Sequence, residues 1–165
     1  MEPQLASHAR EMFSVLSDPA IYEFENEPPI HLDWLEKRFQ RLESRASPDG
    51  GELWLNWVIR VESGILVGYV QATVNADQTA YVAYGFNSQY WRQGIGSGAV
   101  RALMRELRQN YGVTTILAVL KTRNYRSMGL LKKLGFAPAT EELAVKHSDD
   151  TDESVMVHEA STNAA

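Results

Sequence analysis

The pattern of apolar residues predicts three amphipathic helices. Within 6–16, 32–45 and 99–110, apolar side chains recur three and four positions apart, which places them on one helix face. Asp18-Pro19 ends the first helix, and a loop at 47–51 follows the second. The three apolar faces consist of Ala9, Met12, Phe13 and Leu16; Trp34, Leu35, Phe39 and Leu42; and Ala99, Val100, Leu103, Met104 and Leu107.

Short apolar segments bounded by turn residues predict strands at 53–62, 65–74, 79–86 and 113–120. Short turns join the first three, so we expect an antiparallel meander. A last helix is predicted at 126–134, and two weaker strands at 136–145 and 154–159 flank an acidic turn over 148–152. This order of elements predicts a mixed α/β (α+β) fold.

The composition is typical of one globular domain spanning residues 1–165. With 165 residues, of which 44% are hydrophobic, the chain can bury a substantial core. No segment approaches the ~20 apolar residues of a membrane span, and the start lacks a secretory-signal pattern, so we expect a cytoplasmic protein without a membrane partner.

The residues absent or scattered in the chain exclude several chemistries. Cysteine is absent, so neither a disulfide nor a cysteine nucleophile is possible. The four histidines are scattered without ligand spacing, and no metal site is expected. The net charge of −5 argues against nucleic acid as the main partner.

The stretch Gly94-Ile95-Gly96-Ser97-Gly98 carries the clearest chemical signal. The predicted strand at 79–86 precedes it, and a predicted helix follows it directly. Glycines let the backbone approach a ligand closely, and the free N–H groups of a first helical turn point at an anion with the helix dipole behind them. We therefore expect a ligand with a pyrophosphate group here.

Three classes of phosphate ligand compete for this stretch. A Walker loop requires Lys and then Ser or Thr after its last glycine, whereas Ala99-Val100 follow Gly98. A dinucleotide fingerprint would accept Gly94, Gly96 and Ala99, but the next predicted strand runs into Lys121 rather than an acid that could bind a ribose. A dinucleotide-binding oxidoreductase is therefore the weaker alternative, and coenzyme A is favoured.

Two segments resemble motifs of the GNAT superfamily of N-acetyltransferases. Residues 124–136, NYRSMGLLKKLGF, are similar to the family's closing signature N-x-x-S-x-x-L-L-x-x-L-G-F. The glycine stretch is similar to the family's acetyl-coenzyme A loop, Q/R-x-x-G-x-G/A. Pairing Gly94 with Gly96 puts Trp91 first in that motif, and pairing Gly96 with Gly98 puts Gln93 first. The spelling YWRQGIG at 90–96 resembles the ribosomal-protein and N-terminal acetyltransferase branch and favours the first register.

The resemblance implies acetyl-coenzyme A as cofactor and a set of residues around it. In the family, a strand splay before the glycine loop pairs with the pantetheine arm and supplies backbone N–H groups to the oxyanion. Gly85 occupies that place and is expected to be catalytic, although simple relief of crowding stays open. The implied cofactor-binding residues are Tyr84, Phe86, Trp91, Arg92, Gln93, Gly94, Ile95, Gly96, Ser97, Gly98, Asn124 and Arg126.

The resemblance also identifies a donor for the leaving thiolate. Many members use a Tyr seven residues after the Asn of the last helix, but Leu131 stands there. The N-terminal acetyltransferase branch has a Ser three residues after the Asn, which matches Ser127, so we expect Ser127 to be catalytic. Alternatively, Ser127 is only a capping residue at the start of the helix.

The acceptor side is less defined. The proton of the attacking amine would go to Glu23, Glu25, Glu27, His31 or Glu52, or to water. Aromatic residues in the same half, Tyr22, Phe24, Trp34, Trp54 and Trp57, would wall the acceptor site together with acids of 149–153, or belong to the core. A protein N-terminus, a polyamine, an aminoglycoside-like compound and an amino acid all stay open as acceptors.

The sequence therefore predicts an acetyl-coenzyme A-dependent N-acetyltransferase for a primary amine on a small molecule or peptide N-terminus, acting as monomer or homodimer. The alternative is a module of the same fold that binds acetyl-coenzyme A without catalysis. The resemblance implies a mixed, mostly antiparallel sheet flanked by about four helices. The family usually opens with a strand, but only residues 1–4 precede the first helix, so that strand is expected to be truncated or missing.

Overall fold

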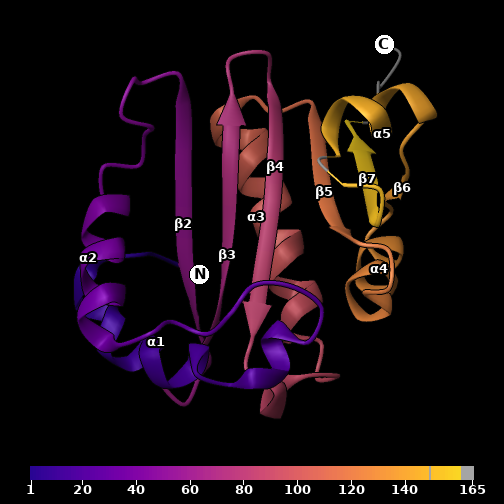
Figure 1. The fold of residues 1–165 in the computed structure, drawn as a ribbon. Helices are drawn as coiled ribbons and strands as arrows, with labels where there is room; N and C mark the ends of the chain where they lie inside the picture. Colours follow the sequence, from indigo (N-terminus) through magenta and orange to yellow (C-terminus); the bar gives the residue numbers. More distant parts are fainter. Residues whose placement is uncertain (149, 161–165) are drawn as a thin grey trace.

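One mixed sheet organises the chain in the computed structural model, which describes residues 1–148 and 150–160. Within these residues seven strands follow the order β1-β2-β3-β4-β5-β7-β6 (Figure 1). All neighbours are antiparallel except β4 and β5, so the mixed, mostly antiparallel sheet is confirmed. The strands are β1 (Glu2–Pro3), β2 (Glu52–Arg60), β3 (Leu66–Asn75), β4 (Thr79–Phe86), β5 (Thr115–Lys121), β6 (Ala137–Pro138) and β7 (Glu153–Glu159).

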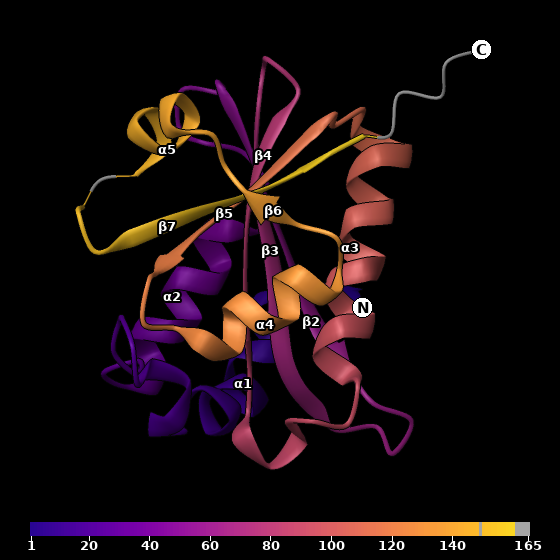
Figure 2. The same cartoon turned by 90° about the vertical axis from the view of Figure 1, so that its right-hand side faces the viewer.

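Helices cover both faces of the sheet. Figures 1 and 2 show α1 and α2 on one face of β2–β4 and α3 on the other. The α-helices in the described part are α1 (Ala9–Leu16), α2 (Leu32–Leu42), α3 (Ile95–Tyr111), α4 (Tyr125–Lys133) and α5 (Glu141–His147). Short 3₁₀ turns lie at η1 (Ala6–His8), η2 (Pro19–Tyr22) and η3 (Ser88–Tyr90). None of these helices is long and apolar enough to cross a membrane.

Strand alternation divides the core into two clusters. Val82 and Phe86 of β4 pack in the larger cluster, which includes residues of α3 and α4. Val58 and Leu66 pack with α1 and α2 in the smaller one. Tyr84 therefore faces α3 and α4, whereas Tyr81, Ala83 and Gly85 face the side of α1 and α2. This second side is called the acceptor face below.

The sheet opens between β4 and β5. The two parallel strands pair only where Thr79–Tyr81 of β4 meet Thr115–Leu117 of β5. Beyond these residues β5 pairs with β7 alone, while β4 continues beside β3 to Phe86. The backbone edges of 82–86 and 118–121 thus diverge (Figure 1). This gap, the β4–β5 opening, lies next to the start of α3 and α4.

The first strand is short, in agreement with the expectation of a truncated or missing strand. Only Glu2 and Pro3 form β1, which pairs with Val58 and Trp57 at the edge of the sheet. The predicted helix at 99–110 is also longer than expected, because α3 begins at Ile95 and takes Gly96 and Gly98 into its first turn.

The strand predicted at 136–145 is wrong. Only Ala137 and Pro138 pair with β7, and α5 follows. Proline lacks the N–H that a continuing strand needs. Thr140 then caps the helix by accepting from the Leu143 N–H at 3.4 Å, and two glutamates in the first turn favour its positive end. Asp149, expected in the acidic turn, lies outside the described residues.

Candidate active site

The glycine loop ends in a helix start with free N–H groups. Gly94 caps α3 in the left-handed region, with φ of 81°. The Gly98 N–H donates to the Gly94 carbonyl at 2.9 Å, so the N–H groups of Ile95, Gly96 and Ser97 have no acceptor within the helix. A Cβ on Gly94 or Gly98 would meet nothing within 4 Å. The loop therefore presents backbone donors on an open surface, which suits a phosphate group.

Gly96 has a different part in the loop. A Cβ at this position would lie 3.3 Å from Leu130 Cδ1 and 3.5 Å from Phe86 Cε2. The missing side chain lets the start of α3 pack closely on α4 and on the end of β4. Gly96 thus brings the helix start to the edge of the β4–β5 opening.

The side chains before the glycines hold the loop in place. Trp91 Nε1 donates to the Phe86 carbonyl at 2.7 Å, and Gln93 Nε2 donates to the Gln89 carbonyl at 2.8 Å. Arg92 is exposed and has a left-handed backbone with φ of 60°, which a non-glycine residue rarely adopts. Two residues of the loop, Arg92 and Gly94, thus have left-handed backbone conformations before α3 begins.

Backbone groups of β4 face the opening at two positions. The register pairs Gly85 with Tyr69 of β3, and the Gly85 carbonyl points toward β3, since a Cβ on Gly68 would lie 2.3 Å from it. In an antiparallel pair the direction of the backbone groups alternates. The N–H and C=O groups of Tyr84 and Phe86 therefore point toward the opening.

Gly85 lies at the height of the opening but turns its backbone groups toward β3. A Cβ on Gly85 would come within 2.7 Å of Tyr69 Cε1 and 3.3 Å of the Tyr69 hydroxyl. The glycine thus leaves room for the Tyr69 ring on the acceptor face. This geometry fits the crowding alternative better than a direct donor role.

Ser127 and Tyr84 form a hydroxyl pair on the opposite face. Ser127 Oγ and the Tyr84 hydroxyl lie 2.6 Å apart, and either can donate. Burial raises the pKa of Tyr84 to about 12, against the lowering effect of the bond to Ser127. The side chain of Asn124 caps α4, accepting from the Ser127 N–H at 3.0 Å, so the Ser127 hydroxyl is not the cap.

Sequence reasoning missed the hydroxyl of Tyr84. In the sequence, Tyr84 stands out only as part of the strand before the glycine loop. Alternation along β4 could have found this hydroxyl, because Tyr84 shares the helix-facing side with Val82 and Phe86.

Arg126 joins three segments beside the glycine loop. Its guanidinium pairs with Glu23 and stacks on the rings of Phe24 at 4.8 Å and Trp91 at 4.6 Å. The loop after η2, the start of α4 and the glycine loop therefore meet here. A phosphate bound by Arg126 would have to compete with the Glu23 carboxylate.

Most of the candidate bases are engaged elsewhere. Glu23 pairs with Arg126, His31 Nδ1 accepts from the Trp34 N–H at 3.1 Å and caps α2, and Glu52 accepts from Trp54 Nε1 at 2.9 Å. The lone pairs used in these contacts of Glu23, His31 and Glu52 are not available to accept a proton from an amine. Glu27 is exposed.

Glu25 differs from the other candidates. It is half-buried, and burial raises its pKa, with Lys121 opposing the rise and Glu153 adding to it. Glu25 also adds to the raised pKa of Tyr69, which is due mainly to burial of the phenol. Glu25 thus lies on the acceptor face, between the end of β5 and Tyr69.

The aromatic candidates divide between core and surface. Trp57 is 4% exposed and belongs to the core. Trp34 is exposed, Trp54 is half-buried, and the Tyr22 hydroxyl donates to the Leu16 carbonyl at 2.8 Å. Phe24 packs edge-on against Tyr125 and beneath Arg126. In the described part of the chain no group of three His, Asp or Glu side chains could hold a metal ion.

The sequence profile of the acetyltransferase (GNAT) domain family matches residues 2–137. The chain belongs to the GNAT acetyltransferase family. The family resemblance expected from the two motifs is therefore confirmed, and with it the assignment as an N-acetyltransferase. The fold agrees, because the mixed, mostly antiparallel sheet with helices on both faces is the architecture that the resemblance implies.

Individual relatives of this GNAT protein act on different amines. It is 27% identical over 122 residues to the [ribosomal protein bS18]-alanine N-acetyltransferase of Escherichia coli, covering 74% of this chain and 76% of the relative. Among solved structures, the ribosomal-protein-S5-alanine acetyltransferase of Vibrio fischeri has a TM-score of 0.79 at 17% identity, covering 98% and 92% of the chains. The spermidine N-acetyltransferase of Vibrio cholerae in complex with CoA and spermine has a TM-score of 0.76 at 14% identity, covering 96% and 93%. The two structures show a shared fold.

Proposed function

We propose that this GNAT enzyme binds acetyl-coenzyme A at the β4–β5 opening and transfers the acetyl group to a primary amine. One observation carries the proposal: the free N–H groups at the start of α3, the unpaired edge of β4 and the Ser127–Tyr84 hydroxyls lie around one gap in the sheet. A phosphate site, an extended-chain site and a proton donor are the three parts that the cofactor requires.

The cofactor would lie along the opening with its phosphates at α3. The N–H groups of 95–97 would bind the pyrophosphate, with the open surface of Gly94 and Gly98 admitting it. Trp91, Arg92 and Gln93 would hold or flank this loop. The pantetheine arm would pair with the backbone groups of Tyr84 and the N–H of Phe86, as a further strand would, and reach Asn124; the Phe86 carbonyl already accepts from Trp91 Nε1.

Bound acetyl-coenzyme A supplies a thioester carbonyl that an amine can attack. The N–H groups of β4 that face the opening are placed to stabilise the developing oxyanion. The Tyr84 phenol is protonated at neutral pH, as any phenol of ordinary pKa is, and the burial that raises its pKa to about 12 keeps the proton on the oxygen until a base forms beside it. The Ser127–Tyr84 pair can deliver a proton to the leaving sulfur, and Gly85 leaves room for the Tyr69 ring on the acceptor face beside it.

Glu25 would take the proton from the amine, directly or through water. Its carboxylate lies on the acceptor face, and its raised pKa brings it closer to the range in which a carboxylate serves as general base. The acceptor class is a small-molecule amine or a peptide N-terminus, in keeping with the bS18-alanine and spermidine acetyltransferases to which the chain is similar. A cytoplasmic location and assembly as monomer or homodimer stay predictions.

Release of free thiol from acetyl-coenzyme A tests this function. The purified protein is mixed with acetyl-coenzyme A and, separately, spermidine, a peptide with N-terminal alanine and an aminoglycoside. We expect amine-dependent thiol release that falls in Ser127→Ala. Binding of acetyl-coenzyme A without thiol release for any amine would instead indicate the non-catalytic module.

A further inference from the structure

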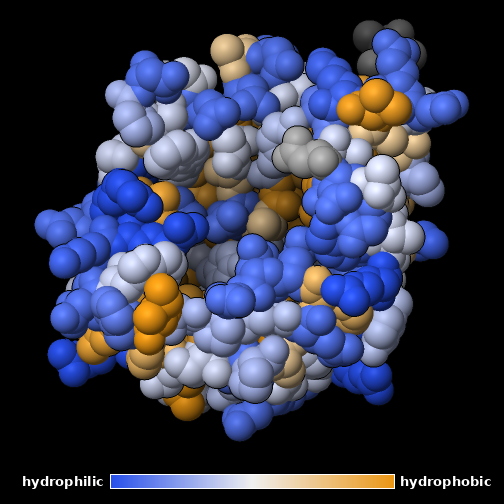
Figure 3. All heavy atoms as spheres, viewed as in Figure 1, coloured by the Kyte–Doolittle hydropathy of each residue, from blue (hydrophilic) through white to orange (hydrophobic). Residues whose placement is uncertain are grey.

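A polar hollow lies on the acceptor face, away from the β4–β5 opening. Figure 3 shows this face hollowed in front of the central strands. A cavity of about 420 Å³ lies between α2 and the middle of β2 and β3. Its lining includes Arg38, Arg41, Trp54, Asn56, Gln71 and Thr73.

Two arginines make this cavity positive. Arg38 and Arg41 are three residues apart on α2 and so share one side of the helix. Among the described residues neither guanidinium has a carboxylate partner; Arg38 instead lies over the Trp34 ring at 5.6 Å. The amides of Asn56 and Gln71 add neutral donors to the wall. Such a set of donors suits a carboxylate, which a guanidinium can bind through two hydrogen bonds.

The acids near this cavity are already hydrogen-bonded. Asp49 and Glu52 line a neighbouring cavity that shares Trp54 with this one. The Asp49 carboxylate accepts from Ser47 Oγ and from the Gly51 N–H, and Glu52 accepts from Trp54 Nε1. Neither forms an ion pair with the two arginines.

The strand register places the cavity at a defined distance from the opening. Asn56 of β2, Gln71 of β3 and Ala83 of β4 form one row across the sheet. Ala83 is exposed and lies on the same face as Gly85, two residues before it. Strands are about 4.8 Å apart, so the cavity lies roughly 10 Å from the far edge of β4, where the thioester is expected.

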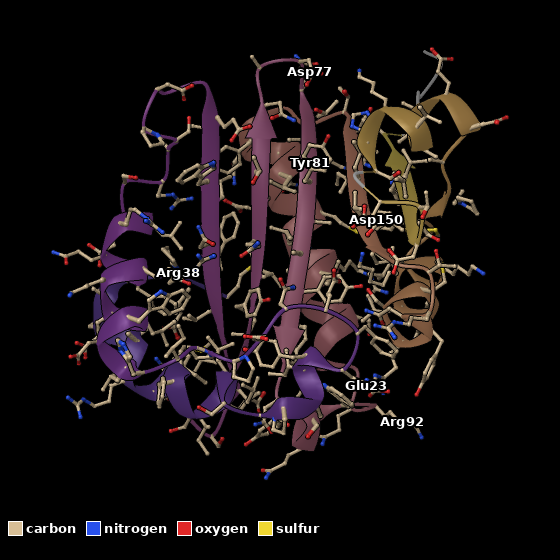
Figure 4. All side chains as sticks on the ribbon, viewed as in Figure 1. Glu23, Arg38, Asp77, Tyr81, Arg92 and Asp150 are labelled. Atoms are coloured by element: carbon tan, nitrogen blue, oxygen red, sulfur yellow. The ribbon has the colours of Figure 1, made fainter. Side chains whose placement is uncertain are left out.

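The acceptor face is polarised across the strands, from α2 at one end to β7 at the other. Tyr69 lies between the two ends, because its phenol interacts electrostatically with Arg38 on one side and with Glu25 on the other. Glu25 in turn interacts with Asp152 and Glu153 as well as Lys121. Figure 4 shows Arg38 and Asp150 on opposite sides of the central strands. The face is therefore positive toward α2 and predominantly acidic toward β7.

We propose that the Arg38–Arg41 cavity binds a carboxylate of the acceptor, and that the enzyme prefers a short peptide whose carboxylate lies about 10 Å from the amine it acetylates. Three extended residues span at most roughly 10 Å, which matches the distance across the strands. The amine would lie toward Glu25 and the carboxylate between the two guanidiniums. A polyamine offers no group for this cavity. The inference rests on the proposed function for the position of the amine.

Binding of a matched pair of probes tests the proposal without requiring turnover. Trialanine as free acid and trialanine amide have the same length and amine and differ in one charge. Calorimetric titration of each, into protein saturated with coenzyme A, is compared for wild type, Arg38→Gln/Arg41→Gln and the control Lys37→Gln. Lys37 is exposed on α2 and does not line the cavity. Thermal unfolding of each variant checks that it is folded.

We expect the free acid to bind wild type and Lys37→Gln at least ~10-fold more tightly than the amide, and the double variant to lose this preference. Equal affinity for the two probes, no binding of either, or the same loss in Lys37→Gln would overturn the proposal. Thiol release with any other amine would show that the acetyltransferase function stands even then. Absence of acetyl-coenzyme A binding would count against the proposed function instead.

Discussion

Two hydroxyl groups at the β4–β5 opening come from residues 43 positions apart in the chain. Tyr84 lies on β4 and Ser127 in the first turn of α4, and their oxygens are 2.6 Å apart. Because serine alone is a weak acid, the neighbouring phenol gives the pair a second route for the proton. The two side chains should therefore act as a unit.

Removing either hydroxyl should lower turnover. We expect Ser127→Ala and Tyr84→Phe each to reduce kcat by ~10-fold or more, and the double variant to lose less than the product of the two. Steady-state kinetics of thiol release measure this, with Tyr125→Phe, an exposed hydroxyl on the same helix, as control. Fully multiplicative effects would show that the hydroxyls act independently.

Glu25 should set the acidic limb of the pH profile. Its pKa is raised, so kcat/KM is expected to fall as the pH drops through this raised pKa, and Glu25→Gln should remove that limb along with most of the activity. Glu27→Gln, an exposed carboxylate of the same loop, should keep it. An unchanged profile in Glu25→Gln would assign the proton to water.

The raised pKa of Glu25 also predicts that Glu25→Gln is more stable than wild type at pH 7. A carboxyl with a raised pKa in the folded state contributes stability at low pH that is lost as the pH rises through the folded-state value. Glu25→Gln keeps a neutral side chain at every pH, so it should unfold at a higher temperature than wild type at pH 7. Thermal unfolding across pH measures this, and the difference should vanish in acid.

At the scale of elements, the start of α3 depends on one left-handed glycine. Gly94 has φ of 81° and Gly98 lies inside the helix, yet a Cβ on either would meet nothing within 4 Å. Both positions have room for a methyl group, and they differ only in backbone conformation. They form a matched pair for testing the loop.

Gly94→Ala should destabilise the fold by ~1–2 kcal/mol, because a side chain disfavours the left-handed region. Gly98→Ala should stabilise it by ~0.5–1 kcal/mol, because alanine is a better helix former. Urea unfolding of the two variants measures both free energies. Equal effects at the two positions would contradict the conformation assigned to Gly94.

Elements with strong periodicity and clear boundaries were predictable. The sequence predicts the apolar stripes of α1, α2 and α3, the meander and the short first strand. It also predicts the cap of α4, because asparagine is a favoured residue at the start of a helix and Asn124 fills that position. The segment after Phe136 was not predicted correctly, because a short apolar run fits strand and helix equally until Thr140 is read as a cap.

The site was predictable in its motifs and less so in its geometry. The glycine loop and Ser127 stand out in the sequence, whereas the partner hydroxyl of Tyr84, the pairing of Arg126 with Glu23 and the burial of Glu25 depend on tertiary contacts. Gly85 illustrates the limit: its position was read from the motif, but the direction of its carbonyl depends on register with β3.

At the scale of the whole molecule, polar contacts connect the acceptor half to the cofactor half. Glu23 pairs with Arg126 of α4. The Asp18 carboxylate accepts from the N–H of Ser88, which follows the end of β4, at 2.6 Å. Both contacts lie at the edge of the β4–β5 opening (Figure 4 labels Glu23). The segment 18–25 is thus held against the loop where the cofactor phosphates are proposed to bind.

Breaking the Glu23–Arg126 pair should free a cation for the cofactor. We expect Glu23→Gln to change the free energy of unfolding by less than ~1 kcal/mol, as for other exposed ion pairs, and to tighten acetyl-coenzyme A binding several-fold. Calorimetric titration measures the affinity, with Glu62→Gln in the exposed β2–β3 turn as control. Weaker binding in Glu23→Gln would indicate that Arg126 positions the loop and does not contact a phosphate.

The most direct test of the proposed cofactor site is a calorimetric titration of the purified protein with acetyl-coenzyme A, with NADH titrated in parallel. A cofactor site at the β4–β5 opening predicts saturable binding of acetyl-coenzyme A at one site per chain and no heat with NADH. Folded protein that shows no heat with acetyl-coenzyme A, or that binds NADH instead, would contradict the proposed site.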